Sequence, residues 1–244
     1  MPGTFSRRCI PYTPRRRELR ESTFAIVTTS GVHLRDQEPF PLEGDNSWRE
    51  IPGDVQSSQL MVTHDHYDHR HADLDINCVF PIDRLRELAS QGEIGGVSTL
   101  HLGFMGYSQF LKDFYERVAP AMAQRIDRSR ADAVLLTAGC PLCHRTVVAI
   151  QREIEMCGIP TVLITLVPEG SGQMGPSRAI HPVGFTLGDC TGGPFQDDLQ
   201  RSVVRDALRR WEARLEAGII WDIDYPDYRR DPAISGTGEV IHDQ

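Results

Sequence analysis

The sequence predicts a single α/β domain whose sheet is mostly parallel and carries helices on both faces. Two observations predict it. Runs rich in β-branched residues alternate with amphipathic stretches, and the chain reads as strand, helix, strand between residues 131 and 167. A chain of 244 residues suits one such domain. We expect an N-terminal arm over 1–20, a long loop over 35–57 and an irregular tail over 218–244.

The first half of the chain contains clear start and stop signals. The apolar run over 23–34 predicts a strand that ends in a loop, and the Pro- and Gly-rich stretch 35–57 leads to a short strand over 58–64. From Pro81 onward, a proline in the first turn and glycine beyond the end predict a helix. A second helix over 107–128 should bend or break near Pro120, because proline lacks a backbone N–H.

The second half predicts a βαβ unit. It comprises a strand over 131–138, a helix over 144–156 and a strand over 161–167. Parallel strands joined in this way place sites outside their carboxyl ends. A charged amphipathic helix over 195–217 should pack on the sheet.

Composition excludes several classes of function. No apolar run approaches the ~20 residues that a membrane helix needs, and the arginines near the N-terminus precede no signal-peptide core, so we expect a cytoplasmic protein. The net charge is −8 and basic residues form no stripe beyond the arm, which argues against nucleic acid. The expected partner is a small molecule that carries a carboxylate, and the chain could also form a homo-oligomer.

Cys140 and Cys143 lie where a buried strand stops at Gly139 and a helix begins. Unpaired N–H groups and the helix dipole favour a thiolate there, so Cys140 suits a nucleophile and Cys143 suits a resolving thiol. The other four cysteines are single and scattered, which argues against a disulfide framework and for mostly reduced thiols. We expect His144 and His66 to move protons, and Thr29 and Gly139 to contact substrate.

The stretch THDHYDHRHADLD resembles the zinc motif of the metallo-β-lactamase superfamily, although the surrounding helices do not suit that β-sandwich. Its candidate ligands for zinc or another divalent metal are His64, His66, Asp68 and His69. The alternative is a polar loop that lines a pocket, with one or two histidines as acid or base. Further on, a glycine-rich segment carries Arg178 and His181, which could bind a substrate carboxylate or belong to an ordinary loop.

An ordered set of motifs resembles the glycine/sarcosine/betaine/D-proline reductase selenoprotein B family, and the chain has a length similar to the D-proline reductase member. The motifs include THDHYDH, FPIDRLRELASQGEIG, TAGCPLCHRTV and HPVGFTLGD. The resemblance implies a selenocysteine where Cys140 stands, a cysteine matching Cys143, and a partner subunit with a pyruvoyl group. It implies attack on the carbon beside an activated amine, reductive cleavage of the carbon–nitrogen bond, and release of selenium by thiol exchange. Here sulfur occupies position 140.

Three functions follow from these features. The first is a cysteine-dependent enzyme that cleaves a C–N or C–S bond of a small, amino-acid-derived substrate, which could be cyclic. The second is a zinc-assisted hydrolase or desulfhydrase, acting for example on a thiohydantoin-like ring. The third is a non-catalytic thiol-relay subunit of a larger reductase complex.

Overall fold

The computed structural model describes residues 9–213 and 216–229 and forms an eight-stranded sheet. The strand order is β10-β9-β8-β7-β1-β6-β3, with β5 paired to β1. Every pairing in this sheet is parallel except that of β3 with β6. The strands are β1 (Thr23–Thr29), β3 (Trp48–Pro52), β5 (Gly96–Val97), β6 (Leu100–Phe104), β7 (Ala133–Ala138), β8 (Thr161–Ile164), β9 (Ala179–Pro182) and β10 (Ile220–Ile223). A separate antiparallel pair joins β2 (Val32–Leu34) to β4 (Leu60–Val62).

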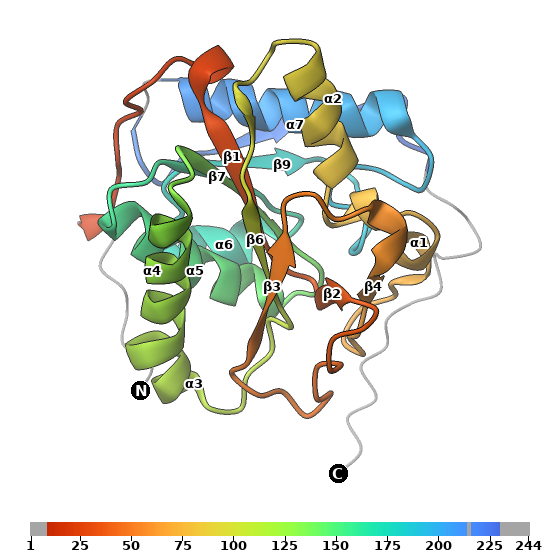
Figure 1. Cartoon of the computed structure of the whole chain (residues 1–244), viewed down its shortest axis with the longest axis vertical. Coiled ribbons are helices and arrows are strands. Elements are labelled where there is room, and N and C mark those ends of the chain that lie inside the picture. The colour runs from red at the N-terminus through yellow and green to blue at the C-terminus, as the bar shows by residue number, and fades with distance from the viewer. Residues whose placement is uncertain (1–8, 214–215, 230–244) are drawn as a thin grey trace.

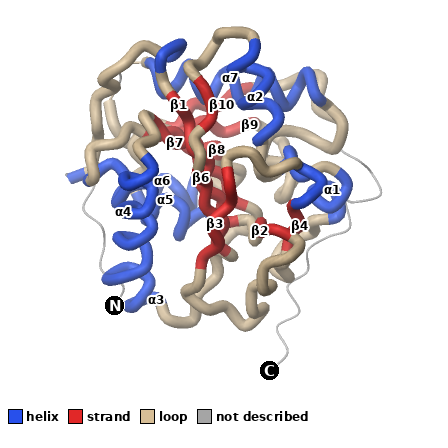
Figure 2. The backbone as a smooth tube through the Cα atoms, in the orientation of Figure 1, coloured by secondary structure: helices blue, strands red, loops and turns tan. Residues whose placement is uncertain are grey.

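Helices cover both faces of the sheet, which confirms the predicted class (Figures 1 and 2). In Figure 1, α2 and α7 run together along one side, whereas α4, α5 and α6 lie on the other. The helices are α1 (Arg70–Leu74), α2 (Ile82–Ser90), α3 (Leu111–Asp113), α4 (Ala119–Ser129), α5 (Cys143–Met156), α6 (Pro168–Met174) and α7 (Asp197–Glu212). Within the described ranges, no helix has the length and apolar character that crossing a membrane requires.

Each face of the sheet has its own hydrophobic core. Side chains alternate along β1, so that Phe24 and Ile26 face α2 and α7, whereas Ala25 and Val27 face α4 and α5. All six residues of β7 are buried, as expected of a central strand with helices on both sides.

The chain leaves β1 and β7 in opposite directions, although these two strands are neighbours. From β1 it continues to β5 and β6, and from β7 it continues to β8 on the far side. In open α/β sheets, sites form outside the carboxyl ends of the strands at such a switch point. Thr29 ends β1, and Gly139 and Cys140 follow β7.

Local conformation modifies two of the predicted elements. The strand over 23–34 is divided into β1 and β2, because Gly31 adopts a φ of +75° and passes close to Thr63. The helix over 107–128 does not break at Pro120. Instead, a π-helical turn (Phe114–Val118) separates α3 from α4, in keeping with the missing N–H of that proline.

Several strands lie where irregular chain was expected. The loop over 35–57 contains β3, the tail over 218–244 contains β10, and the glycine-rich segment contains α6 and β9. Strand β6 has no counterpart among the predicted elements. The first eight residues of the arm and residues 230–244 of the tail lie outside the described residues.

Candidate functional site

The site is built around Cys140 and Cys143 at the carboxyl end of β7. The two cysteines are joined in a disulfide, with Cα atoms 5.0 Å apart, and both are fully buried. The backbone N–H of Cys143, the first residue of α5, donates a hydrogen bond to Sγ of Cys140 at 3.2 Å. The predicted strand–turn–helix geometry is thus present. The expectation of reduced thiols holds for the other described cysteines, which are Cys9, Cys78, Cys157 and Cys190.

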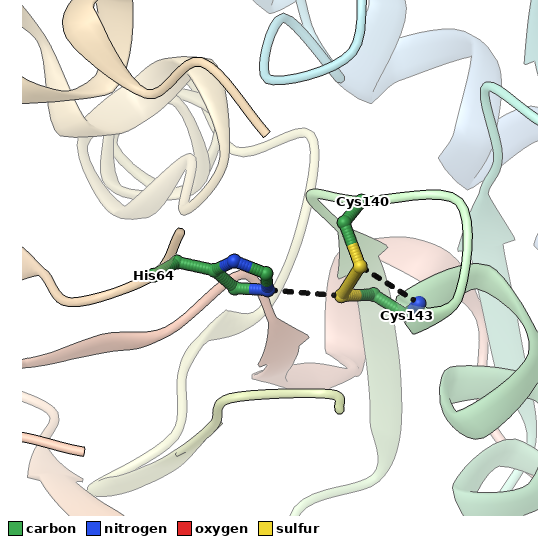
Figure 3. A group of neighbouring side chains, drawn as sticks. All are labelled: His64, Cys140 and Cys143. Carbon is green, nitrogen blue, oxygen red and sulfur yellow. Dashed lines mark hydrogen bonds between the residues drawn. A yellow bond between two sulfur atoms is a disulfide. The ribbon is translucent and has the colours of Figure 1, made fainter. Parts of the chain in front are cut away.

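His64 approaches the disulfide from the opposite side, from the segment after β4 (Figure 3). Its Nε2 lies 3.2 Å from Sγ of Cys143. Its Nδ1 accepts the backbone N–H of His66 at 2.9 Å, so the proton of the neutral ring resides on Nε2. Burial, followed by the charges of His66 and His69, lowers the pKa of His64 to about 3. The ring is therefore neutral and directs an N–H group at the sulfur of Cys143.

Tyr67 covers the loop that carries the cysteines. Its hydroxyl donates to the carbonyl of Ser30 at 2.9 Å, and its ring occupies the space that a side chain at Gly139 would need. The ring also lies against Gly188. Tyr67 was not among the residues predicted from the sequence. Two signals pointed to it: its position among the histidines, and the glycine that precedes Cys140.

Thr29 and Gly139, expected to contact substrate, lie beside the disulfide and shape its surroundings. The hydroxyl of Thr29 donates to the carbonyl of Cys143 at 3.1 Å. On the far side of the same cysteine, Gly106 has a φ of +91°, and a β-carbon there would lie 2.6 Å from Sγ of Cys143. Strand ends β1, β6 and β7 thus enclose the sulfur pair.

His144 connects two loops through both of its ring nitrogens. Its Nδ1 donates to the carbonyl of Cys140 at 2.6 Å, and its Nε2 accepts the N–H of Leu166 at 2.9 Å. Burial lowers its pKa to about 4, so the ring stays neutral. With both nitrogens engaged, the geometry favours a structural role over the expected proton transfer. His66 is exposed, pairs with Asp65 at 2.7 Å and contacts the ring of Tyr107.

Arg178 lies away from the site, which corrects its expected role. It precedes β9 and so sits at the amino end of the parallel strands, whereas Cys140 follows the carboxyl end of β7. Its guanidinium is 1% exposed, bonds the buried carboxylate of Glu155 at 2.8 Å and stacks on Tyr12. His181, also expected to bind substrate, lies on β9 and pairs with Asp222 at 2.8 Å.

The four predicted metal ligands do not converge as a set. Asp68 pairs with Arg70, and His69 pairs with Asp73. Among the described residues, two groups have possible ligand atoms within 4.8 Å of one another: His64 with both cysteines, and His64 with Asp65 and His66. A histidine that ligates metal usually donates its other N–H to an acceptor, whereas Nδ1 of His64 faces a donor. This hydrogen bond argues against metal binding through Nε2 of His64, and the two sulfurs could act as ligands only after the disulfide is reduced.

Comparison with known proteins gives a consistent set of relatives. A family model described as glycine/sarcosine/betaine reductase selenoprotein B (GRDB) matches residues 5–139. The chain is 40% identical to the D-proline reductase subunit gamma of Acetoanaerobium sticklandii over 88% of each chain. It is 28% identical to a glycine reductase complex component B subunit gamma of Carboxydothermus hydrogenoformans, covering 87% of this chain but only 51% of that one. No solved structure matches the chain.

Proposed function

Because this chain belongs to the glycine/sarcosine/betaine reductase selenoprotein B family, we propose that it is the thiol-bearing subunit of a reductase that cleaves a carbon–nitrogen bond in a small cyclic amino acid. The observation that carries the proposal is the bonded sulfur pair at the switch point of the sheet. A pair that can close a disulfide can supply two electrons. The 40% identity to a D-proline reductase subunit over most of both chains favours D-proline as the first substrate to test.

The proposed reaction has two steps. The thiolate of Cys140 attacks the carbon beside the activated nitrogen, forming a C–S bond while the C–N electron pair leaves with nitrogen, which takes up a proton. The thiolate of Cys143 then attacks Sγ of Cys140, forming the disulfide, and the carbon keeps the C–S pair and takes up a second proton. The substrate gains two electrons, and the dithiol loses them. An external dithiol reduces the disulfide for the next cycle.

Serine substitutions of the two cysteines test these roles separately. The assay follows loss of D-proline and appearance of the ring-opened amino acid by mass spectrometry, with dithiothreitol as reductant. Cys140→Ser should abolish turnover. Cys143→Ser should stop after one attack and leave substrate covalently bound to Cys140, visible as added mass on the intact chain. Cys157→Ser, at an exposed and free cysteine, is the matched control. Turnover by Cys140→Ser would rule out this nucleophile.

The requirement for a partner subunit is a separate part of the proposal. Several relatives are named as components of reductase complexes, which supports assembly of this chain with another subunit. We expect the purified chain to react only when assayed together with the subunits that co-purify with it. Full activity of the chain alone would refute this expectation and would also exclude a purely relaying role.

A zinc-dependent hydrolase or desulfhydrase is the competing proposal, since His64 and the two cysteines gather close together. The hydrogen bond that His64 accepts from His66 argues against it. Elemental mass spectrometry of the reduced protein separates the two. About one zinc per chain, with activity lost on chelation and restored by zinc, would favour the metal reaction over the thiol reaction.

A further inference from the structure

We propose that His64 is a positioning residue that holds the sulfur of Cys143 as a thiolate once the disulfide is reduced. This inference rests on the proposed function, because it gives the resolving sulfur its reactive form. The carrying observation is the pairing of Nε2 with Sγ of Cys143 at 3.2 Å, with Nδ1 committed to the backbone N–H of His66.

The tautomer of His64 determines what the ring can do. Since Nδ1 accepts a hydrogen bond, Nε2 carries the proton, and Nε2 is the atom that faces the sulfur. The ring is 4% exposed, so water competes little for that donor, and the carbonyl of Met105 is the other acceptor near the ring. A neutral N–H donor favours a thiolate over a thiol, because hydrogen bonds to charged acceptors are the stronger ones.

A second contact of Cys143 acts in the opposite sense. Its Sγ lies 3.6 Å from the carbonyl of Met105, and the sulfur can donate a hydrogen bond to this carbonyl only as a protonated thiol. Removing the donor of His64 would leave this carbonyl as the polar neighbour that favours the thiol. The two sulfurs therefore have different hydrogen-bond donors. Sγ of Cys140 accepts from a backbone N–H, whereas Sγ of Cys143 faces a side chain that can be replaced by mutation.

The step that His64 assists is the opening and closing of the disulfide. When the thiolate of an external dithiol attacks Sγ of Cys140, a new S–S bond forms and the old one breaks. The electron pair of the broken bond stays on Sγ of Cys143. The Nε2–H group of His64 stabilises the resulting thiolate by a hydrogen bond and keeps its proton. In the reverse direction, the same hydrogen bond keeps Cys143 deprotonated for its attack on Cys140.

Two polar substitutions of similar character test the role. The amide nitrogen of His64→Gln can occupy the position of Nε2, whereas that of His64→Asn reaches only the position of Nδ1. The measurement is the equilibrium between dithiol and disulfide in glutathione buffers of known composition, with each form trapped by alkylation and weighed as intact protein. His66→Gln, which leaves the backbone N–H in place, is the matched control.

His64→Asn should shift the equilibrium toward the disulfide by about ten- to hundredfold, the effect of losing one hydrogen bond to a charged group. The dithiol–disulfide equilibrium constants of His64→Gln and His66→Gln should stay within about threefold of that of the unmodified protein, because the hydrogen bond to Sγ of Cys143 is kept in both. A shift of the same size in His64→Gln and His64→Asn, or no shift in His64→Asn, would overturn the proposal. No substrate is involved, so a failure of the proposed reductase reaction would appear in the turnover assay and not here.

Discussion

The ring of Tyr67 lies so close to Gly139 that a β-carbon at position 139 would stand 2.4 Å from its Cε1 atom. The ring and the cysteine loop therefore fit together only while residue 139 has no side chain. Tyr67 is also fixed at its far end by the hydrogen bond to Ser30.

Gly139→Ala should displace the Tyr67 ring and uncover the sulfur pair. We expect a loss of about 1 to 3 kcal/mol in the free energy of unfolding, typical of overpacking, and faster alkylation of the reduced cysteines by iodoacetamide. Gly172→Ala is the control, because a β-carbon there meets its nearest neighbour at 3.9 Å, an ordinary contact. Unchanged alkylation in Gly139→Ala would show that the ring does not restrict access.

Tyr67→Phe separates the ring from its hydroxyl. The variant keeps the ring over Gly139 but leaves the carbonyl of Ser30 without this donor. Urea unfolding should show a loss of about 1 kcal/mol, while alkylation of the reduced cysteines stays slow. If alkylation accelerates as much as in Gly139→Ala, the hydrogen bond of the hydroxyl, rather than the ring alone, controls access to the cysteines.

Arg178→Met should destabilise the fold strongly, because it leaves the carboxylate of Glu155 buried without its ion-pair partner. Removing one member of a buried pair costs about 3 to 5 kcal/mol. The matched control is Arg125→Met, whose partner Glu50 is 47% exposed and whose loss should cost less than about 1 kcal/mol. Denaturation midpoints of both variants measure the difference, and equal losses would contradict the burial argument.

Stability should decline in acid because of His144. Its pKa is about 4 in the folded protein, below the ordinary value of 6.5, so the unfolded chain binds a proton first as the pH falls. The contribution is fully present above pH 6.5 and is lost as the pH falls through that value toward 4, by on the order of 3 kcal/mol.

His144→Asn keeps a donor near the Nδ1 position and removes this titration. Its free energy of unfolding should therefore change less between pH 7 and pH 4.5 than that of the unmodified protein, as followed by urea unfolding at each pH. His64 and His101, whose pKa values are both about 3, titrate in the same direction in both proteins and cancel in the comparison. Parallel pH profiles would contradict the assignment to His144.

The central strands and their helices could be predicted because their residues are uniformly buried. Strand β7 is apolar along its length, and α5 begins directly after a cysteine turn. The edge strands gave weaker signals. Only Ile51 is buried in β3, and no residue is fully buried in β10, so neither forms an apolar run. Strand β6 contains His101, whose Nδ1 accepts the backbone N–H of Ile26, an arrangement that depends on a distant strand.

The site was predictable where the chemistry is local and not where it depends on pairing across the fold. The cysteines lie three residues apart, and their strand–helix context identified them. The partner of Arg178 is a carboxylate 23 residues away on another element, so a charge that suits a substrate carboxylate was already satisfied inside the protein. His64 and Cys143 are 79 residues apart in the sequence, and no pattern of neighbouring residues predicts their contact.

Pro141 and Leu142, between the two cysteines, are exposed, with Leu142 at 46%, while both sulfurs are enclosed beneath them. Thiol exchange requires an incoming sulfur to reach along the S–S axis. The buried disulfide is therefore shielded from thiols dissolved in the surrounding solvent. In the proposed thiol exchange, an incoming sulfur must therefore displace the cover that His64 and Tyr67 form over the disulfide, so this cover would select among reaction partners before any bond forms.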